Sequence, residues 1–111
     1  MKMQKSGCWL MILEWSNFAL DDLQDIKHYI SKDSPYYARE FIDLVFSTVE
    51  RLTDFPFSGR HVPEAKDNQI REVIVQSYRA MYRVESNRIV ILAVMHGSRD
   101  LNYPDNQPWD A

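Results

Sequence analysis

The segment Arg88–His96, with the sequence RIVILAVMH, limits the possible folds most strongly, because its seven interior residues are all apolar. A strand without a polar face must be covered on both sides, so we expect it to be the central strand of a sheet with a layer packed on each face. Two segments rich in Val, Ile and Tyr precede it, at Ile70–Val75 and Ala80–Glu85. The short polar links at 76–79 and 86–87 suit hairpins. The sequence therefore predicts a three-stranded antiparallel meander.

The N-terminal part of the chain predicts one strand and one amphipathic helix. The apolar run Trp9–Trp15 predicts a strand at or near an edge of the sheet. Ser16 or Asn17 can cap a helix that begins near Phe18, because their side-chain oxygens accept a hydrogen bond from a free backbone N–H. Apolar residues then recur at helical spacing, at Ala19, Leu23, Ile26 and Ile30. One side of this helix is expected to face the core.

A second helix is predicted after Ser34, which supplies a cap ahead of Pro35 at the first helical position. Its apolar stripe continues to Thr53 or Asp54, before a segment that contains Pro and Gly. Only Lys32–Asp33 separate the two helices, so we expect an antiparallel hairpin. Because the hairpin can cover one face of the sheet, the predicted fold class is α+β.

The length of the chain favours a single domain, and its charge disfavours nucleic-acid binding. We expect one domain over residues 1–111, with a body at 9–100 and a tail at 101–111. The formal net charge of −3 and the pI near 5.5 lack the basic excess of proteins that bind phosphates. No direct nucleic-acid binding is therefore expected of the chain alone. The tail contains Trp109, and two alternatives stay open: it folds back onto the body or a partner, or it is disordered.

The cysteine content and the apolar runs predict a cytoplasmic protein without a metal or another cofactor. Cys8 is the only cysteine, and no Cys/His cluster has the spacing of a zinc site. The apolar run Cys8–Leu13 is shorter than the core of a signal peptide. No stretch approaches the roughly 20 apolar residues that cross a membrane, so no membrane association is expected.

Directional polar side chains are concentrated in the second half of the chain and are candidates for a functional site. They are Arg60, Arg71, Tyr78, Arg79, Tyr82, Arg83, Arg88, His96 and Arg99. Alternation along the second strand predicts that Arg79, Met81 and Arg83 share one face of the sheet. Tyr82 and Val84 should then share the opposite face. A face that mixes arginine with apolar residues can bind either a phosphate or an acidic helix of a partner protein.

Each of these residues also has a purely structural interpretation. Arg71–Glu72 and Arg83–Glu85 can be surface ion pairs of small energy. Tyr78 and Tyr82 can be half-buried strand aromatics with hydrogen-bonded hydroxyl groups. His96 can transfer a proton or can be a structural histidine. No serine lies in a nucleophile motif, so a hydrolase triad is not expected.

Four segments, taken in order, resemble the ParE/RelE superfamily of small bacterial toxins from toxin–antitoxin pairs. They are WSNFALDDLQDIKHYI, SPYYAREFIDLVFSTVERLTDFPFSGRHVPE, IREVIVQSYRAMYRV and RIVILAVMHGSRDL, and together they cover roughly residues 9–101. The most specific feature is the order Pro-x-x-Gly-Arg-x-Val-Pro-Glu, Arg-Glu, Tyr-Arg and His-Gly-x-Arg. The resemblance implies an N-terminal strand and an antiparallel helical hairpin packed on a curved antiparallel sheet.

The resemblance implies one of two activities. RelE-like members cleave messenger RNA in the ribosome without a metal, using basic and tyrosine or histidine side chains, whereas ParE-like members inhibit DNA gyrase. The ending His96-Gly97-Ser98-Arg99 looks ParE-like. The acidic residues that follow it, Asp100, Asp105 and Asp110, would repel RNA. We therefore expect a ParE-like toxin that arrests growth by binding gyrase and has no catalytic residue.

The residues expected to bind the target or the antitoxin are Arg60, Arg71, Tyr78, Arg79, Tyr82, Arg83 and Arg99. The alternative activity is a ribosome-dependent endoribonuclease. Its acid and base would be His96 with Tyr82 or Tyr103, and its phosphate ligands would be Arg60, Arg79 or Arg99. A third interpretation is an inactive protein of the same fold that survives as a binding module.

The apolar surface of the sheet predicts a partner as well. Strict alternation along the last strand groups Ile89, Ile91, Ala93 and Met95 on one face, and Val90, Leu92, Val94 and His96 on the other. Both faces are then apolar, yet the hairpin covers only one, and an exposed apolar patch marks an interface. The resemblance implies that the partner is a cognate antitoxin in a hetero-oligomer. We expect a helical or extended antitoxin segment on the second face, held by apolar anchors and acidic-to-arginine pairs.

Overall fold

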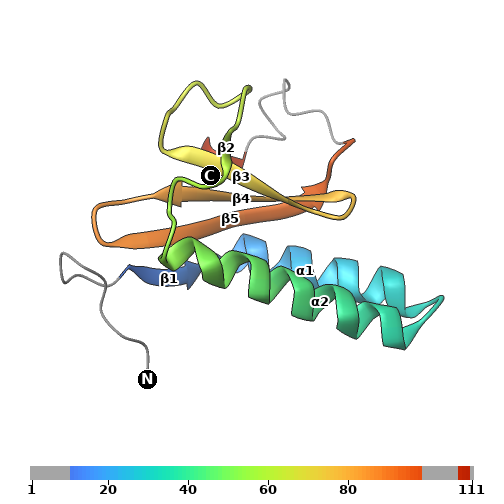
Figure 1. Cartoon of the computed structure of the whole chain (residues 1–111). Helices are drawn as coiled ribbons and strands as arrows, with labels where there is room; N and C mark the ends of the chain where they lie inside the picture. The colour runs from blue at the N-terminus through green and yellow to red at the C-terminus, as the bar shows by residue number, and fades with distance from the viewer. Residues whose placement is uncertain (1–10, 99–107, 111) are drawn as a thin grey trace.

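The computed structural model describes residues 11–98 and 108–110, in which two helices pack on one face of a five-stranded sheet (Figure 1). In chain order the elements are β1 (Ile12–Trp15), α1 (Asn17–Ser31), α2 (Pro35–Glu50), the 3-10 helix η1 (Arg51–Thr53), β2 (Arg60–His61), β3 (Ile70–Val75), β4 (Tyr78–Val84), β5 (Arg88–His96) and the 3-10 helix η3 (Pro108–Asp110). The predicted α+β class is confirmed. Within the described ranges, neither helix has the length and apolar character that crossing a membrane requires.

Both predicted helix caps are present. The Ser16 Oγ accepts a hydrogen bond from the backbone N–H of Ala19 at 3.0 Å, and the Ser34 Oγ accepts one from Tyr37 at 3.2 Å. These bonds satisfy donors that have no partner inside the first turn of a helix. α2 ends earlier than predicted, at Glu50, and the chain tightens into η1 before leaving the helix. The caps therefore fix where each arm of the hairpin begins.

The predicted meander is present as β3, β4 and β5, but it is only part of the sheet. The strand order is β1-β5-β4-β3-β2, so β4 and not β5 lies at the centre. β1 pairs in parallel with β5 at one edge, and the short β2 pairs with β3 at the other. β4 begins at Tyr78, before the predicted Ala80, because a tight turn at Gln76–Ser77 replaces the longer link, with Gln76 at φ 55°. The predicted strand residues 9–10 lie outside the described part of the chain.

A β-bulge in β5 changes the predicted distribution of its side chains between the two faces. Tyr82 pairs with Ile91 and Met81 with Ala93, so Leu92 has no partner on β4. One extra residue reverses the alternation of every side chain beyond it. The face toward the hairpin therefore carries Ile89, Ile91 and Val94, and the opposite face carries Val90, Ala93 and Met95. The predicted grouping of Ala93 and Met95 with Ile91 is wrong for this reason.

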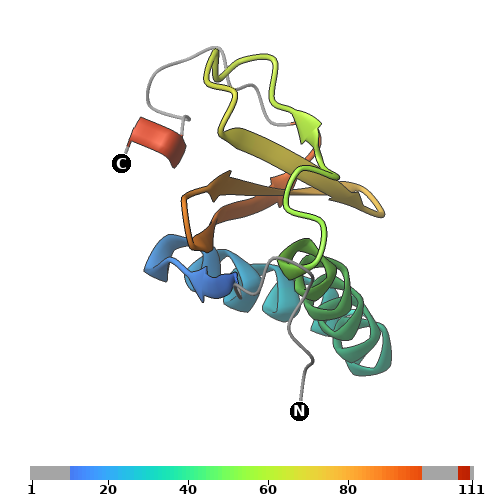
Figure 2. The same ribbon diagram turned by 60° about the vertical axis from the view of Figure 1, so that its left-hand side comes forward.

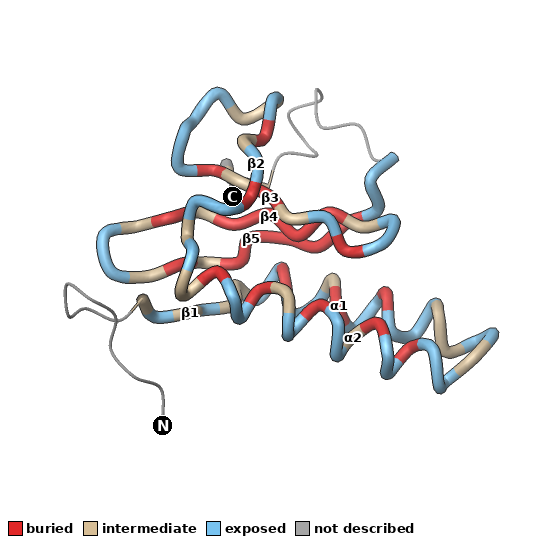
Figure 3. Tube along the Cα trace, in the orientation of Figure 1, coloured by how far each residue is buried: buried red, intermediate tan, exposed pale blue. Residues whose placement is uncertain are grey.

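Residues of the same chain cover both faces of the sheet (Figure 3), so the apolar residues of β5 on the second face do not form the exposed patch that the sequence predicts. The larger cluster joins the hairpin to the sheet, through Leu23 and Ile26 of α1 and Phe41 and Val45 of α2. The smaller cluster, on the opposite face, consists of Val62, Ile70, Met81, Leu92, Ala93 and Met95, with Ala65 and Trp109 packed against it. η3 lies on the side of the sheet away from the hairpin (Figure 2). The sequence left open whether the tail folds back or is disordered, and Trp109 folds back onto the body of the protein.

Ser16 connects α1 to the bulge, which suggests a matched pair of stability variants. Its hydroxyl caps α1 and also donates to the Leu92 carbonyl at 3.1 Å, whereas the Ser34 hydroxyl only caps α2, through a bond that is exposed. Ser34→Ala should lower the free energy of unfolding by about 1 kcal/mol and Ser16→Ala by about 2–3 kcal/mol, because a partly buried carbonyl also loses its donor. Urea denaturation of both variants measures the difference. Equal losses would contradict the role of Ser16 at the bulge.

Candidate functional site

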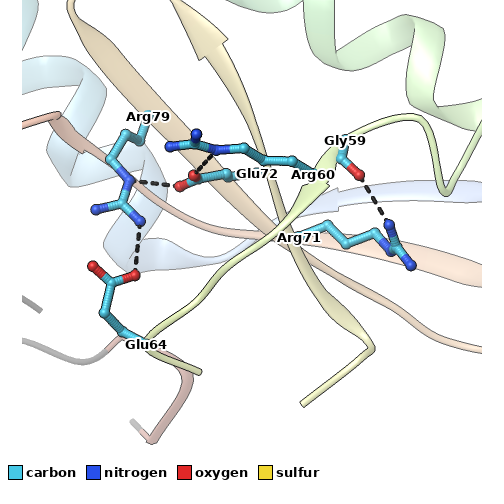
Figure 4. Close-up of polar contacts among 6 residues, drawn as sticks. All are labelled: Gly59, Arg60, Glu64, Arg71, Glu72 and Arg79. Atoms are coloured by element: carbon cyan, nitrogen blue, oxygen red, sulfur yellow. Dashed lines mark hydrogen bonds and ion pairs between the residues drawn. The ribbon is translucent and has the colours of Figure 1, made fainter. Parts of the chain in front are cut away.

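A buried carboxylate on β3, that of Glu72, joins Arg60 of the Gly-Arg motif to Arg79 of the Tyr-Arg motif (Figure 4). Its Oε1 accepts a hydrogen bond from the Arg79 Nε at 2.5 Å, and its Oε2 accepts one from the Arg60 Nε. Arg79 also donates from Nη2 to the Glu64 Oε1 at 3.2 Å. Glu72 is only 1% exposed, so these contacts replace water around its charge. The predicted surface pair of Arg71 with Glu72 is wrong, since these neighbours point to opposite faces of β3.

The two carboxylates also set the charge state of Arg79. Burial disfavours the charged guanidinium, but the hydrogen bonds and charges of Glu72 and Glu64 outweigh that effect and raise the pKa of Arg79 above its ordinary value. Arg79 is therefore a permanent cation whose charge is neutralised within the chain. Its side chain is 7% exposed, which leaves little of it for a partner.

Arg60 is the accessible member of this network. Its side chain is 64% exposed although its Nε is held by Glu72. It lies at a pocket of about 390 Å³ that is also lined by Pro63, Glu64, Ile74, Gln76, Ser77, Tyr78, Arg79 and Gly97. A guanidinium fixed through Nε presents its other nitrogens in a defined plane, which suits recognition of a carboxylate. The network therefore orients one exposed arginine at the mouth of a polar pocket.

Tyr82 fixes the loop that carries Arg60. Its hydroxyl donates to the Pro56 carbonyl at 2.8 Å and accepts from the Gly59 N–H at 3.0 Å, and the residue has no exposed surface. A Cβ at Gly59 would lie 2.4 Å from this hydroxyl oxygen and 2.6 Å from the Glu72 carbonyl oxygen. Glycine is therefore required there by the close approach of β4 and β3. Any effect of Tyr82 on binding would pass through this loop.

Burial raises the pKa of Tyr82 above its ordinary value of 10.0, although the hydrogen bond with Gly59 and the charge of Arg71 lower it. Arg71 lies on the same face as Tyr82. Its Nη1 donates to the Gly59 carbonyl at 3.0 Å, and its guanidinium carbon lies 4.9 Å from the centre of the Phe57 ring. Arg71 and Tyr82 thus hold the loop from the side opposite to Glu72.

The remaining candidates are distributed around the sheet. Tyr78 packs between the rings of Phe41 and His96, with centroid distances of 5.0 and 5.4 Å. His96 is exposed, and its Nδ1 lies 2.8 Å from the Ser98 Oγ. Arg83 donates from Nη2 to the Trp109 carbonyl at 3.1 Å. Arg99 and Tyr103 lie outside the described residues.

The predicted site residues therefore divide between two faces of the sheet. Arg60, Arg79 and Arg83 lie on the face opposite to the hairpin, which we call the arginine face, together with the cluster under Trp109. The face toward the hairpin carries Arg71, Tyr78, Tyr82 and His96. His96 on β5 pairs with Tyr78 on β4, and Tyr82 comes four residues after Tyr78 on the same strand. Tyr82 therefore lies about 13 Å along the strand from His96.

The sequence pattern does not predict the place of Glu72 and Glu64 in this network. It predicts Glu72 in a surface ion pair, and Glu64 only as part of the Pro-Glu motif. Strand alternation could have revealed that Glu72 is buried. Alternation places the Glu72 side chain beside the apolar Met81, on the face opposite to Arg71. Glu64 lies in the loop between β2 and β3, where no periodicity specifies side-chain direction.

Comparison with known proteins identifies the class that this fold and these motifs define. The fold is that of toxins from type II toxin–antitoxin systems. The family model of the ParE toxin of the type II toxin–antitoxin system parDE matches residues 13–101. The chain belongs to this ParE toxin family.

Individual relatives agree with this assignment. The protein Y4kP of Sinorhizobium fredii is 33% identical over 86 residues, which are 76% of this chain and 85% of the relative. A chain of the chromosomal ParDE toxin–antitoxin system from P. aeruginosa superimposes with a TM-score of 0.65 at 25% identity, covering 78% of this chain and 95% of that one. A chain of the RelBE2 toxin–antitoxin complex from Mycobacterium tuberculosis has a TM-score of 0.52 at 20% identity, covering 78% and 98%, and shows the shared fold.

The buried position of Glu72 leads to a stability prediction. Glu72→Gln removes the charge that faces Arg60 and Arg79, and should lower the free energy of unfolding by about 3 kcal/mol, because a buried guanidinium loses its main counter-charge. Glu40→Gln, at an exposed position of α2, should change it by less than about 0.5 kcal/mol. Urea denaturation at neutral pH compares the two. A Glu72→Gln variant as stable as the control would contradict the structural role of the network.

Tyr82→Phe tests the hydroxyl that fixes the Arg60 loop. It should lower the free energy of unfolding by about 1–3 kcal/mol at neutral pH, because the Gly59 N–H and the Pro56 carbonyl lose their partner. The raised pKa of Tyr82 in the folded state means that its contribution is complete below the unfolded pKa of about 10 and is lost as the pH rises further. The difference between wild type and variant should therefore narrow above about pH 10. Tyr37→Phe, at an exposed site, is the control, and a gap that widens at high pH would contradict the assignment.

Proposed function

We propose that this chain is the toxin of a type II toxin–antitoxin module, acts in the cytoplasm by inhibiting DNA gyrase, arrests growth, and is neutralised by a cognate antitoxin. Membership of the ParE family supports the toxin role. The observation that carries the choice of target is the neutralisation of Arg79 by Glu72 and Glu64. A phosphate-cleaving site needs cationic side chains that are free to stabilise a developing charge. For Arg79, the carboxylates of Glu72 and Glu64 already occupy that place.

The arrangement of the candidate acid and base supports the same choice. An endoribonuclease would need both groups at a single phosphate. Tyr82 has no exposed surface, and its hydroxyl is engaged by Pro56 and Gly59, while His96 lies at the far end of β5. A binding inhibitor needs no such pair. We therefore assign the chain a role as a binding protein and no catalytic residue.

Within this proposal, the arginine face binds the antitoxin or the target. Arg60 is exposed and oriented there, and Arg83 lies beside the apolar cluster that Trp109 covers. An antitoxin segment rich in acidic residues would match these arginines, whereas the apolar cluster beside them is already buried. Arg79 would contribute indirectly, by holding the Glu72 carboxylate that orients Arg60.

The proposal is tested with purified gyrase, titrated with this chain after its separation from any antitoxin. We expect loss of supercoiling together with accumulation of cleaved DNA. The double variant Arg60→Gln/Arg83→Gln should weaken inhibition by at least about tenfold, because two charge-assisted contacts are removed while glutamine can still donate to Glu72. The control Lys32→Gln/Arg51→Gln removes two exposed charges elsewhere and should retain inhibition.

Two outcomes would contradict the proposal. A folded preparation that arrests growth but leaves gyrase unaffected would exclude gyrase as the target, and messenger RNA on the ribosome would be assayed next. Equal inhibition by the double variant and its control would instead show that the arginine face does not contact gyrase. Near-ultraviolet circular dichroism and urea denaturation of the same variants separate a defect in target recognition from a general loss of structure.

A further inference from the structure

The edge of the sheet beside β2 is only partly covered. The two residues of β2 pair with Arg71 and Glu72, so this ladder stops at Glu72. The chain before β2 turns to the hairpin face, where the Tyr82 hydroxyl binds the Gly59 N–H. Within residues 11–98 and 108–110, no strand pairs with this edge of β3 over Val73–Val75. A free stretch of strand edge can accept an extended segment of another chain.

Alternation identifies which backbone groups of this free stretch point outward. In an antiparallel pair, the residues that exchange hydrogen bonds alternate along each strand. The Val62 N–H donates to the Ile70 C=O at 3.3 Å, toward the β2 edge. The Val84 N–H donates to the Gln69 C=O at 2.9 Å, toward β4. The even-numbered residues of β3 therefore direct their backbone groups to the β2 edge. On the free stretch that residue is Ile74, which is 52% exposed, so its N–H and C=O are available to a partner.

Arg60 lies beside this position, on the same face of the sheet. A strand added next to β3 would continue the line of β2, and its residue opposite Ile74 would lie two positions from Arg60, about 7 Å along the strand. The side chain of that residue would point to the arginine face, as the side chains of Ile74 and Arg60 do. Glu72 holds the Arg60 Nε, so the terminal nitrogens of Arg60 remain to bind an acceptor. A glutamate opposite Ile74 would reach them.

The charges of the adjoining pocket favour a peptide over a phosphate. The charged residues that line the pocket are Arg60, Glu64 and Arg79, and Glu72 binds both arginines. Two positive and two negative charges cancel, so the pocket has no net charge to attract a phosphate. Arg60 is the only one of the four whose side chain is largely exposed. We propose that an extended acidic peptide of a partner protein pairs with Ile74 as an additional strand, antiparallel to β3, and places a carboxylate on Arg60.

The antiparallel orientation allows a short segment to bind, because one residue of the partner then satisfies both backbone groups of Ile74. A second copy of this chain does not fit the position. Pairing of two copies about Ile74 would place an isoleucine where Arg60 needs an acceptor. The pairing rests on the binding role proposed above for the arginine face, but it does not depend on gyrase being the target.

The probe for this site is the blocked pentapeptide acetyl-Thr-Val-Glu-Val-Thr-amide, added to the isotope-labelled full chain and followed in amide proton–nitrogen NMR spectra. We expect the signals of the Ile74 amide and of the Arg60 Nε–H to shift together and to saturate. The dissociation constant should be about 1 mM, because the contact consists of two backbone hydrogen bonds and one charge-assisted pair.

Two altered peptides separate the backbone contact from the charge. Methylation of the glutamate nitrogen removes the N–H that would donate to the Ile74 C=O, and glutamine in place of glutamate removes the charge. Each peptide should bind at least about tenfold more weakly. In the Arg60→Gln chain the glutamate and glutamine peptides should bind alike, whereas the control Arg51→Gln, at an exposed position of η1, should still distinguish them.

Several results would overturn the proposal. One is the absence of a saturable shift at Ile74 with about 10 mM peptide, and another is equal binding by the methylated peptide. Inorganic phosphate that displaces the peptide at the same concentration would identify a phosphate site instead. A shift of Ile74 that depends on protein concentration without peptide would identify pairing of two copies. The spectra also show whether each variant is folded, and no readout involves gyrase, so failure of the pairing is distinct from failure of the proposed target.

Discussion

The structure depends on the need to cover a strand that is apolar on both sides. β5 has no face that water can solvate, so the hairpin must lie on one side of it and other parts of the chain on the opposite side. The hairpin meets that need with two long helices. On the opposite face the cover is made of smaller pieces, Val62 and Ala65 from the loop after β2 and Trp109 from η3. The cover that is assembled from separate loops is the one that borders the candidate binding residues.

Glu72 connects this packing to the proposed function. Its carboxylate lies between β2 and β4 and is satisfied by one arginine from each, so the same contacts hold the edge of the sheet and orient Arg60. Tyr82 and Arg71 hold the preceding loop from the other face. Arg71, Arg79 and Tyr82, which the sequence predicts as binding residues, thus hold the exposed Arg60 or its loop in place. In this small fold, most of the polar side chains near Arg60 hold its loop and its guanidinium in place.

The sequence predicted the elements well because each rests on local chemistry. Ser16 and Ser34 cap the helices, the helical spacing of apolar residues marks the hairpin, and alternation along β4 places Arg79 and Arg83 on one face. The predictions were wrong where contacts between residues far apart in the sequence determine the direction of a side chain. The bulge at Leu92 is stabilised by Ser16, which is 76 residues away in the chain, and no local pattern marks it. The buried state of Glu72 depends in the same way on Arg60 and Arg79, which belong to other strands.

The parallel pairing of β1 with β5 sets the order in which the chain can fold during synthesis. β1 is made first and β5 near the end, and residues 12–15 pair only with residues 88–91. The hairpin can form early because its contacts are local, whereas the complete sheet needs β1 to pair with residues 88–91, which lie far along the sequence. A growing chain therefore has no complete sheet before β5 is made. A partner that recognises the whole sheet can bind only after that strand has emerged.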